Sequence, residues 1–192
     1  MQTYYVRSKK ESDELIKKLD LNCIKEEKIF NKYKEKDIKE AVKKYLLETN
    51  YKYYNMRDKE NASGKYLYKL SSEEVLENMG WYNIFSVFES LSEADNRLVL
   101  QGEIYIDPNA KLIASLDNRK NISNRQAMYN PRYTLSLDLL QRNEPCIPGL
   151  KEIIDYVFIK KLFGIIVEFS FYEIPVGLHQ ENMIIWELRS NY

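Results

Sequence analysis

The sequence predicts an α+β protein of two lobes, built from mainly antiparallel sheets with packed helices. At 192 residues the chain is long enough for one domain or for two small lobes. Alternating apolar and polar residues predict strands, most clearly at 165–172 and 183–189. Apolar residues at helical spacing, preceded by capping residues, predict helices between the strands. The turn signal Asp107-Pro108-Asn109 joins two strands as a hairpin, which favours antiparallel pairing.

Three helices and four strands are expected in the first 91 residues, most of them in a small lobe over residues 1–85. Each helix is preceded by a Ser or Asp that can accept hydrogen bonds from its first turn. The second and third helices also carry a Glu at capping-box spacing from that residue. The helices are expected at 13–19, 38–48 and 72–80, behind caps at Ser12 or Asp13, Asp37 and Ser71, and the strands at 3–6, 51–58, 65–70 and 83–91.

The remaining residues, 86–192, are predicted to form a second lobe with a central hairpin and a closing pair of strands. A helix at 148–161, opened by Pro148 and followed by Gly164, precedes the closing pair. The apolar segment 133–140 fits a helix or a strand equally well. The hairpin strands are expected at 97–106 and 110–116, and a polar loop at 117–131.

The two C-terminal strands each carry a carboxylate on a polar face. A hairpin centred near residues 177–178 makes Glu168 and Glu187 cross-strand neighbours, with Cβ atoms about 5 Å apart. Like charges in that position destabilise a sheet, and Mg²⁺ would offset the repulsion because it is usually held by one or two carboxylates plus phosphate oxygens. The alternative is an ion pair with Arg189, which shares the face of Glu187. The opposite face is then formed by Ile184, Trp186 and Leu188.

The composition argues against several classes of partner. The net charge is zero, so no strong global field attracts nucleic acid or an anionic membrane. No apolar run approaches the ~20 residues of a membrane helix, and the N-terminus lacks the apolar core of a secretory signal. The two cysteines, Cys23 and Cys146, are too few for a disulfide framework or a zinc site. They indicate a reducing compartment, and we expect a cytoplasmic protein.

Several stretches follow one another in a familiar order. KYYNMRD and KYLYKLS flank NASG and are followed by the predicted helix SSEEVLENM. FSVFESL and the hairpin LVLQGEIYIDPNAKLIASL come next, and LKEIIDYVFIKKL, FGIIVEFSFY and MIIWELRSNY end the chain. In this order they resemble the ATP-grasp superfamily, in a compact form, from about residue 13 to the C-terminus.

The resemblance implies an ATP- and Mg²⁺-dependent ligase or phosphotransferase that acts on a small carboxylate substrate, similar to carboxylate–amine ligases. Enzymes of this superfamily phosphorylate a carboxylate and let an amine or thiol attack the acyl phosphate. The strand–loop–strand at 51–70 would cover the phosphates of ATP. The resemblance also implies a role for individual residues. These are Arg57, Gly64, Lys65 and Lys69 at the phosphates, Glu89 and Leu91 at the adenine and ribose, Glu168, Glu187 and Asn191 at Mg²⁺, and Arg119, Arg125 and Arg189 in catalysis.

Some positions depart from the family pattern. Arg57 stands where the family has a phosphate-binding lysine, and Leu188-Arg189 follows Glu187 where the family has Glu-x-Asn. Asn191 is displaced by two residues but remains on the Glu187 face. An inactive relic of the family, or a member with an unusual substrate, is therefore an alternative.

A function of another class also remains open, namely a non-catalytic module that binds a protein or single-stranded nucleic acid, or that forms a homo-oligomer through a strand edge. Aromatic side chains beside cations can stack single-stranded bases. Arg57 can equally form a surface pair with Asp58, and the nearby lysines can form a solvated face. The aromatic and cationic residues concerned are Tyr51, Tyr53, Tyr54, Tyr66 and Tyr68 with Lys52, Lys65 and Lys69.

Overall fold

The computed structural model has an α+β architecture with two antiparallel sheets. The structure describes residues 4–24, 27–60, 65–120, 129–141, 145–176, 179 and 181–190. The chain divides into two compact units, one formed by Ile24–Glu93 and the other by Met1–Cys23 with Ala94–Tyr192. Within the described residues, no helix is both long enough and apolar enough to cross a membrane.

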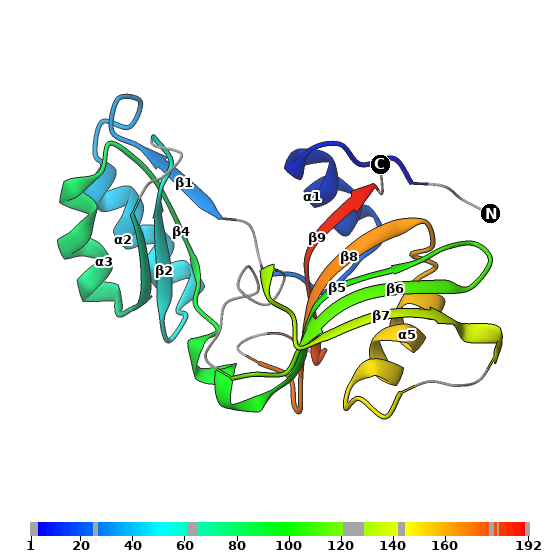
Figure 1. Cartoon of the computed structure of the whole chain (residues 1–192). Helices are drawn as coiled ribbons and strands as arrows, with labels where there is room; N and C mark the ends of the chain where they lie inside the picture. Colours follow the sequence, from blue (N-terminus) through cyan, green and yellow to red (C-terminus); the bar gives the residue numbers. More distant parts are fainter. Residues whose placement is uncertain are drawn as a thin grey trace. The chain divides into compact units, whose positions relative to one another are not determined.

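The unit Ile24–Glu93 contains a four-stranded antiparallel sheet with the strand order β1-β4-β2-β3. Two helices, α2 and α3, cover one face of this sheet (Figure 1). Buried apolar side chains from the helices and from alternate strand positions fill the space between them. The elements are β1 (Lys28–Asn31), α2 (Ile38–Thr49), β2 (Tyr54–Asp58), β3 (Tyr66–Leu70), α3 (Ser72–Asn78), the 3₁₀ helix η1 (Met79–Trp81) and β4 (Ile84–Glu89).

The predicted caps of α2 and α3 are confirmed. The Asp37 carboxylate accepts a hydrogen bond from the Glu40 amide, and Ser71 and Glu74 form a capping box. These bonds satisfy amides that have no partner within the helix, which is why the local sequence alone predicts where α2 and α3 start. The edge strand β1 was not predicted, because only four residues form it and β4 provides its pairing.

The second unit contains a five-stranded antiparallel sheet with the order β7-β6-β5-β8-β9. Helix α5 covers one face of it (Figure 1). Of the segment 133–140, open between helix and strand in the sequence, residues 133–138 form β7 because they pair with β6, and the last two residues begin η3. The elements are α1 (Lys9–Lys18), η2 (Ser92–Arg97), β5 (Leu98–Ile106), β6 (Lys111–Asp117), β7 (Tyr133–Asp138), η3 (Leu139–Gln141), α5 (Leu150–Ile159), β8 (Ile165–Tyr172) and β9 (Met183–Ser190).

The N-terminal segment lies along the outer edge of β9 (Figure 1). Helix α1 starts after Ser8, earlier than predicted, because Ser12 has another role. The buried Ser12 Oγ accepts a hydrogen bond of 2.8 Å from the Leu188 amide, and Ser190 exchanges hydrogen bonds with Val6. These contacts satisfy edge amides of β9 that would otherwise have no partner in the sheet.

This edge pairing places residues before Ile24 with the C-terminal unit. The compact units therefore differ from the predicted lobes, which divide the chain once, after residue 85. Sequence reasoning predicts contiguous lobes because a long-range hydrogen bond such as that between Ser12 and Leu188 leaves no local pattern.

Candidate functional site

Three carboxylates form a row across the five-stranded sheet. Glu103 on β5 pairs in register with Glu168 on β8, and Glu168 pairs with Glu187 on β9. The predicted cross-strand pairing of Glu168 with Glu187 is thus confirmed. The flanking residues Ile104 and Val167 point to the other face and into the core under α5, so the three carboxylates lie on the face opposite that helix.

A β-bulge beside the row changes one detail of the prediction. The register shifts between Glu168 and Phe169, so Trp186 is an extra residue in β9. Ile185 therefore joins Leu188 in the core, and the predicted face of Ile184, Trp186 and Leu188 is wrong. Trp186 instead donates a hydrogen bond of 2.8 Å from Nε1 to Ser170 Oγ, next to the carboxylates.

Arg189 pairs with two members of the row. Its Nη2 atom contacts Glu103 Oε1, and its Nε lies 3.8 Å from Glu187 Oε1. The ion pair with Glu187 is the alternative that the sequence left open. The row thus combines three carboxylates with one guanidinium, a net charge of −2 when all are ionised.

The environment of Glu187 favours its neutral form. Burial raises the pKa of this carboxyl above its ordinary value, and Asp13 of α1 adds to the increase, whereas Lys9 of the same helix opposes it. The side chain nevertheless retains 31% exposure, so solvent or a ligand can reach it. A shallow pocket on the same face is lined by Glu103, Tyr105, Ile113, Ser115 and Ile166, among others.

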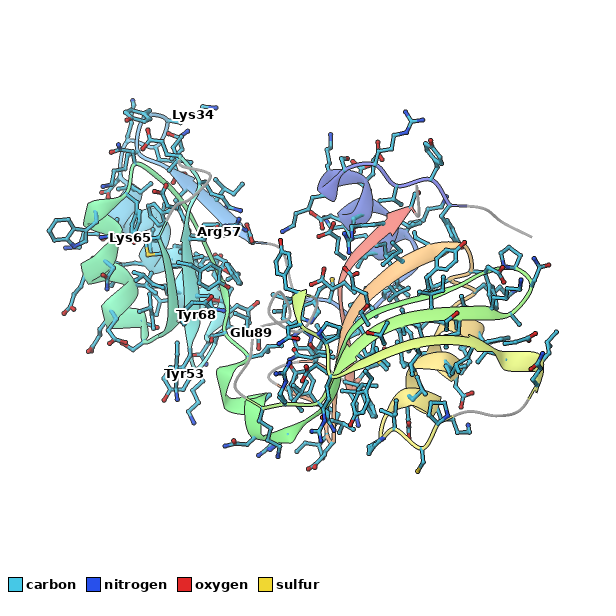
Figure 2. The ribbon with its side chains drawn as sticks, viewed as in Figure 1. Lys34, Tyr53, Arg57, Lys65, Tyr68 and Glu89 are labelled. Atoms are coloured by element: carbon cyan, nitrogen blue, oxygen red, sulfur yellow. The ribbon has the colours of Figure 1, made fainter. Side chains whose placement is uncertain are left out.

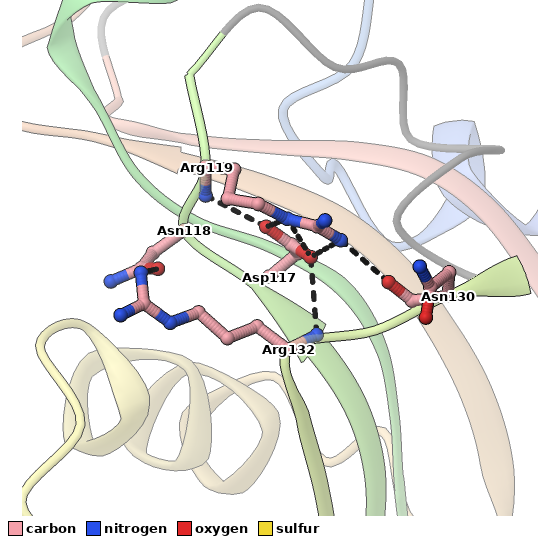
Figure 3. A network of polar contacts seen from close by, with 5 residues as sticks. All are labelled: Asp117, Asn118, Arg119, Asn130 and Arg132. Atoms are coloured by element: carbon pink, nitrogen blue, oxygen red, sulfur yellow. Dashed lines mark hydrogen bonds and ion pairs between the residues drawn. The ribbon is translucent and has the colours of Figure 1, made fainter.

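A second polar cluster lies where β6 ends (Figure 3). The fully buried Asp117 accepts hydrogen bonds from the backbone and side chain of Arg119 and from the Arg132 amide. Burial alone would raise the pKa of Asp117, but these hydrogen bonds outweigh it and hold the pKa below its ordinary value. The Arg119 Nη2 atom also donates to the Asn130 carbonyl, so the guanidinium has a fixed orientation while its side chain remains 43% exposed.

In the other unit, Arg57 lies on the face of the sheet that α2 and α3 leave uncovered (Figure 2). It pairs in register with Tyr66 on β3 and Ser86 on β4, and its side chain is exposed. Among the described residues Arg57 makes no ion pair, so the alternative of a surface pair with Asp58 is not observed there. Lys65, also exposed, directly precedes β3.

Glu89 and Lys69 are not brought to Arg57 by the fold. Glu89 is 5% exposed and lies at the end of β4, with its carboxylate among Tyr45 and Tyr51 on the helix-covered face. Lys69 has a positive φ of 55° at an irregularity of β3, and its ammonium lies 5.2 Å from the centroid of the Tyr53 ring. Leu91 is buried just after β4.

Three predicted site residues, Gly64, Arg125 and Asn191, lie outside the described residues. Within the described part of the chain, no group of three His, Cys, Asp or Glu side chains is arranged to hold a metal ion by itself. A cation on the carboxylate row would therefore need oxygen ligands from another molecule, as Mg²⁺ commonly takes from phosphates and water.

Sequence reasoning missed Glu103 and Asp117. The alternation of Gln101, Glu103 and Tyr105 with buried Leu100, Ile104 and Ile106 is visible in the sequence and places Glu103 on the polar face. Its alignment with Glu168 depends on the pairing of β5 with β8, which are far apart in the chain. The role of Asp117 has no such signal, because it depends on the backbone amide of Arg132, 15 residues further along the chain.

The tyrosine-rich surface is smaller than the sequence suggests. Tyr54 is fully buried and Tyr51 is 8% exposed, so both belong to the core under the helices. Tyr66 and Tyr68 lie with ring centroids 4.1 Å apart, and Tyr68 is exposed (Figure 2).

Comparison with known proteins gives little direct guidance. No family model matches the chain, and no curated protein matches its sequence. Among solved structures, the chain is similar to macrocyclase MdnC bound with precursor peptide MdnA, from Microcystis aeruginosa MRC, with a TM-score of 0.42 and 14% sequence identity. The match covers 94% of this chain and 51% of that chain, so this chain spans about half the length of the solved protein. A likeness at this level assigns neither a family nor an activity.

Proposed function

We propose that this chain is a compact ATP-grasp protein that binds ATP with Mg²⁺ and transfers the terminal phosphoryl group to a carboxylate substrate. The order of its elements supports this proposal. The pair β2–β3 is followed by α3, and the hairpin β5–β6 is followed by α5 and the closing pair β8–β9. This is the order on which the sequence resemblance rests.

The observation that carries the proposal is the direct pairing of Glu168 with Glu187 on the polar face of the five-stranded sheet. Adjacent carboxylates on a sheet repel each other unless a cation is shared between them. Two carboxylates also match the number that proteins usually contribute to Mg²⁺ held on a nucleotide.

Arg57 is the proposed phosphate-binding residue of the four-stranded unit. It is exposed on the open face of the sheet, where it pairs in register with Tyr66. A guanidinium is charged at all relevant pH values and binds phosphate oxygens bidentately, so it can replace a lysine in this role. Lys65 would add a second cation close to β3.

Arg119 is the proposed residue for the substrate carboxylate or the transferred phosphoryl group. Asp117 fixes the Arg119 guanidinium with several hydrogen bonds, so little conformational entropy is lost when an anion binds. Mg²⁺, when bound, would neutralise the phosphates, and the contribution of these side chains is positioning and charge.

The test is calorimetric titration with ATP and a non-hydrolysable analogue, with and without Mg²⁺. We expect Mg²⁺-dependent binding by the wild type and at least a roughly tenfold loss in Glu168→Gln and in Glu187→Gln, because each loses one carboxylate close to the metal. Both variants are expected to fold as well as the wild type, or slightly better, since like-charge repulsion is relieved.

Glu173→Gln is the matched control, because Glu173 is exposed and follows β8 outside the row. It should bind nucleotide like the wild type. Absence of nucleotide binding at millimolar concentration would contradict the proposal, and so would an equal loss in Glu173→Gln and Glu187→Gln. A loss of stability in Glu187→Gln without any nucleotide effect would indicate a structural ion pair with Arg189.

A further inference from the structure

The open face of the four-stranded sheet carries a connected set of aromatic rings. Tyr66 and Tyr68 of β3 point to this face, because Leu67 between them packs against the core under the helices. Their ring centroids lie 4.1 Å apart, and Phe88 of β4 packs edge-on against Tyr66 at 5.9 Å. Phe88 is 7% exposed, whereas Tyr68 is 63% exposed (Figure 2). The three rings therefore form a supported platform whose outermost member, Tyr68, is accessible to a ligand.

Cations lie beside this aromatic platform. Arg57 of β2 pairs in register with Tyr66, and its side chain is exposed. At the start of β2, the ammonium groups of Lys52 and Lys69 lie 5.7 Å and 5.2 Å from the centroid of the Tyr53 ring. Both lysines are exposed as well. Rings interleaved with cations are typical of surfaces that bind single-stranded nucleic acid.

Two acidic side chains near the platform leave this positive charge in place. Glu27 acts on Tyr66, but it forms an ion pair with Lys59. Glu89 is 5% exposed, and its carboxylate lies on the face that the helices cover. The chain has no net charge overall, yet the immediate surroundings of the platform are cationic.

The same face also holds a buried hydroxyl group that has no partner among the described residues. Ser86 of β4 pairs in register with Arg57, so its side chain belongs to the open face. It is fully buried, and its Oγ makes no hydrogen bond within the described part of the chain. Buried polar atoms almost always have a partner, so Ser86 marks a place where a bound molecule can supply the missing one. This observation is independent of the rings and of the cations.

We propose that the open face of the four-stranded sheet, at Tyr66, Tyr68 and Arg57, binds single-stranded nucleic acid. Bases stack on Tyr68 and on the exposed part of Tyr66, and Arg57, Lys52 and Lys69 contact phosphates. A four-stranded sheet with stacking aromatic side chains is a common platform for single-stranded RNA. This activity goes beyond the proposed function and does not rest on it.

The chemistry of the platform favours a single strand over other partners. A duplex keeps its bases stacked on one another, so it offers no base face to Tyr68 along its length. Cations rather than further apolar side chains accompany the rings, which suits a polyanion better than an apolar peptide. Stacking accepts every base, so little sequence preference is expected.

The test is fluorescence anisotropy of a labelled oligonucleotide of about eight nucleotides, as RNA and as DNA, titrated with the full chain. Tyr68→Ala is expected to weaken binding by roughly tenfold or more, because a stacking ring is lost. Tyr68→Phe keeps the ring and should stay close to the wild type. The matching duplex should bind much more weakly than the single strand.

The salt dependence tests the role of the cations. Three phosphate contacts predict that the logarithm of the affinity falls with the logarithm of the salt concentration with a slope of about −2. Arg57→Gln removes one contact, so it should weaken binding and reduce the magnitude of this slope by about 0.7.

Two control variants lie in the same unit but outside the platform. Tyr33→Ala removes an exposed tyrosine that follows β1, and it should leave oligonucleotide binding unchanged. Lys44→Gln removes an exposed cation that pairs with Glu48 on α2, and it should leave the salt slope unchanged. Thermal melting of each variant shows whether it is folded under the conditions of the titration.

Several results would overturn the proposal. These are the absence of RNA and DNA binding at high micromolar protein, equal affinity for the duplex, equal losses in Tyr68→Ala and Tyr33→Ala, and equal changes of slope in Arg57→Gln and Lys44→Gln. Binding of a proline-rich peptide at Tyr68 without any oligonucleotide binding would assign the face to a protein partner, and would also contradict the proposal.

ATP titrations separate this proposal from the proposed function. Oligonucleotide binding is expected to persist without Mg²⁺ and in Glu168→Gln, whereas the proposed ATP binding depends on both the metal and that carboxylate. Oligonucleotide binding without ATP binding would support the nucleic-acid platform and contradict the ATP-dependent function. Mg²⁺-dependent ATP binding without oligonucleotide binding would give the reverse result.

Discussion

At the residue scale, Asp117 determines what Arg119 can do. The sequence presents Arg119 as one of several arginines in a polar segment, with nothing to distinguish it from a solvated side chain. In the structure a buried carboxylate fixes its guanidinium in one orientation. A guanidinium held in this way is better suited to bind an anion than a mobile one, because its ordering entropy has already been lost in folding.

Asp117→Asn is expected to lower the free energy of unfolding at pH 7 by about 2–4 kcal/mol, because it removes a buried charge that accepts several hydrogen bonds. The pKa of Asp117 is depressed in the folded state, so its stabilisation is present above the unfolded value of about 3.9 and disappears as the pH falls through the lower folded value. The difference between wild type and variant, measured by urea denaturation, should therefore shrink in strong acid.

Asp155→Asn is the matched control, because Asp155 pairs with Lys151 on the exposed surface of α5. Its effect should stay within about 0.5 kcal/mol at both pH values. An equal loss of stability in the two variants would mean that Asp117 is no more than a surface charge.

At the element scale, the local elements follow from the sequence more closely than their partners do. The caps of α2 and α3 and the turn between β5 and β6 use side chains a few residues away, so they are visible in the sequence. The start of α1, the strand β1 and the bulge at Trp186 depend on a partner strand or on the β9 edge. The bulge has the greatest effect on the site, because it turns Trp186 away from the core next to Glu187.

Gly102 shows how tightly β5 and β6 are paired next to the carboxylate row. Its φ is +139°, and a Cβ atom there would lie 2.1 Å from the Ser115 carbonyl oxygen. We expect Gly102→Ala to destabilise the protein by about 3 kcal/mol or more, since it adds both backbone strain and a clash with a neighbouring strand. The measurement is chemical denaturation.

Gly80→Ala is the control, because nothing lies within 4 Å of a Cβ atom at that position. It should change stability by less than about 1 kcal/mol. A tolerated Gly102→Ala would show that β5 can move away from β6, and that the register of Glu103 with Ser115 is not rigid.

At the scale of the whole molecule, the chain contains two separate hydrophobic cores. One lies under α5 and α1 and the other under α2 and α3, and within the described part of the chain no buried residue belongs to both. The N-terminal residues belong to the C-terminal core although the entire other unit follows them in the sequence. The five-stranded unit is therefore complete only after both ends of the chain have been joined at β9.

Substitutions in the two cores should act on separate units. Met56→Ala and Leu116→Ala each remove a fully buried side chain, one from each core, and are each expected to cost about 2–5 kcal/mol. Hydrogen–deuterium exchange should then accelerate in the four-stranded sheet for Met56→Ala and in the five-stranded sheet for Leu116→Ala. Acceleration of both sheets by either substitution would show that the units unfold as one.

The sequence by itself determined the α+β class, most strands and helices, the two caps and the pairing of Glu168 with Glu187, because each depends on alternation or on neighbours within one hairpin or turn. Only the tertiary structure decided that Glu103 completes the row, that Arg189 reaches across β8 to pair with it, and that Asp117 holds Arg119. It also decided that the N-terminus belongs with β9. These contacts join residues that are far apart in the sequence and are brought together by the order of the strands in the sheet. Such long-range pairing leaves no periodic signal in the chain.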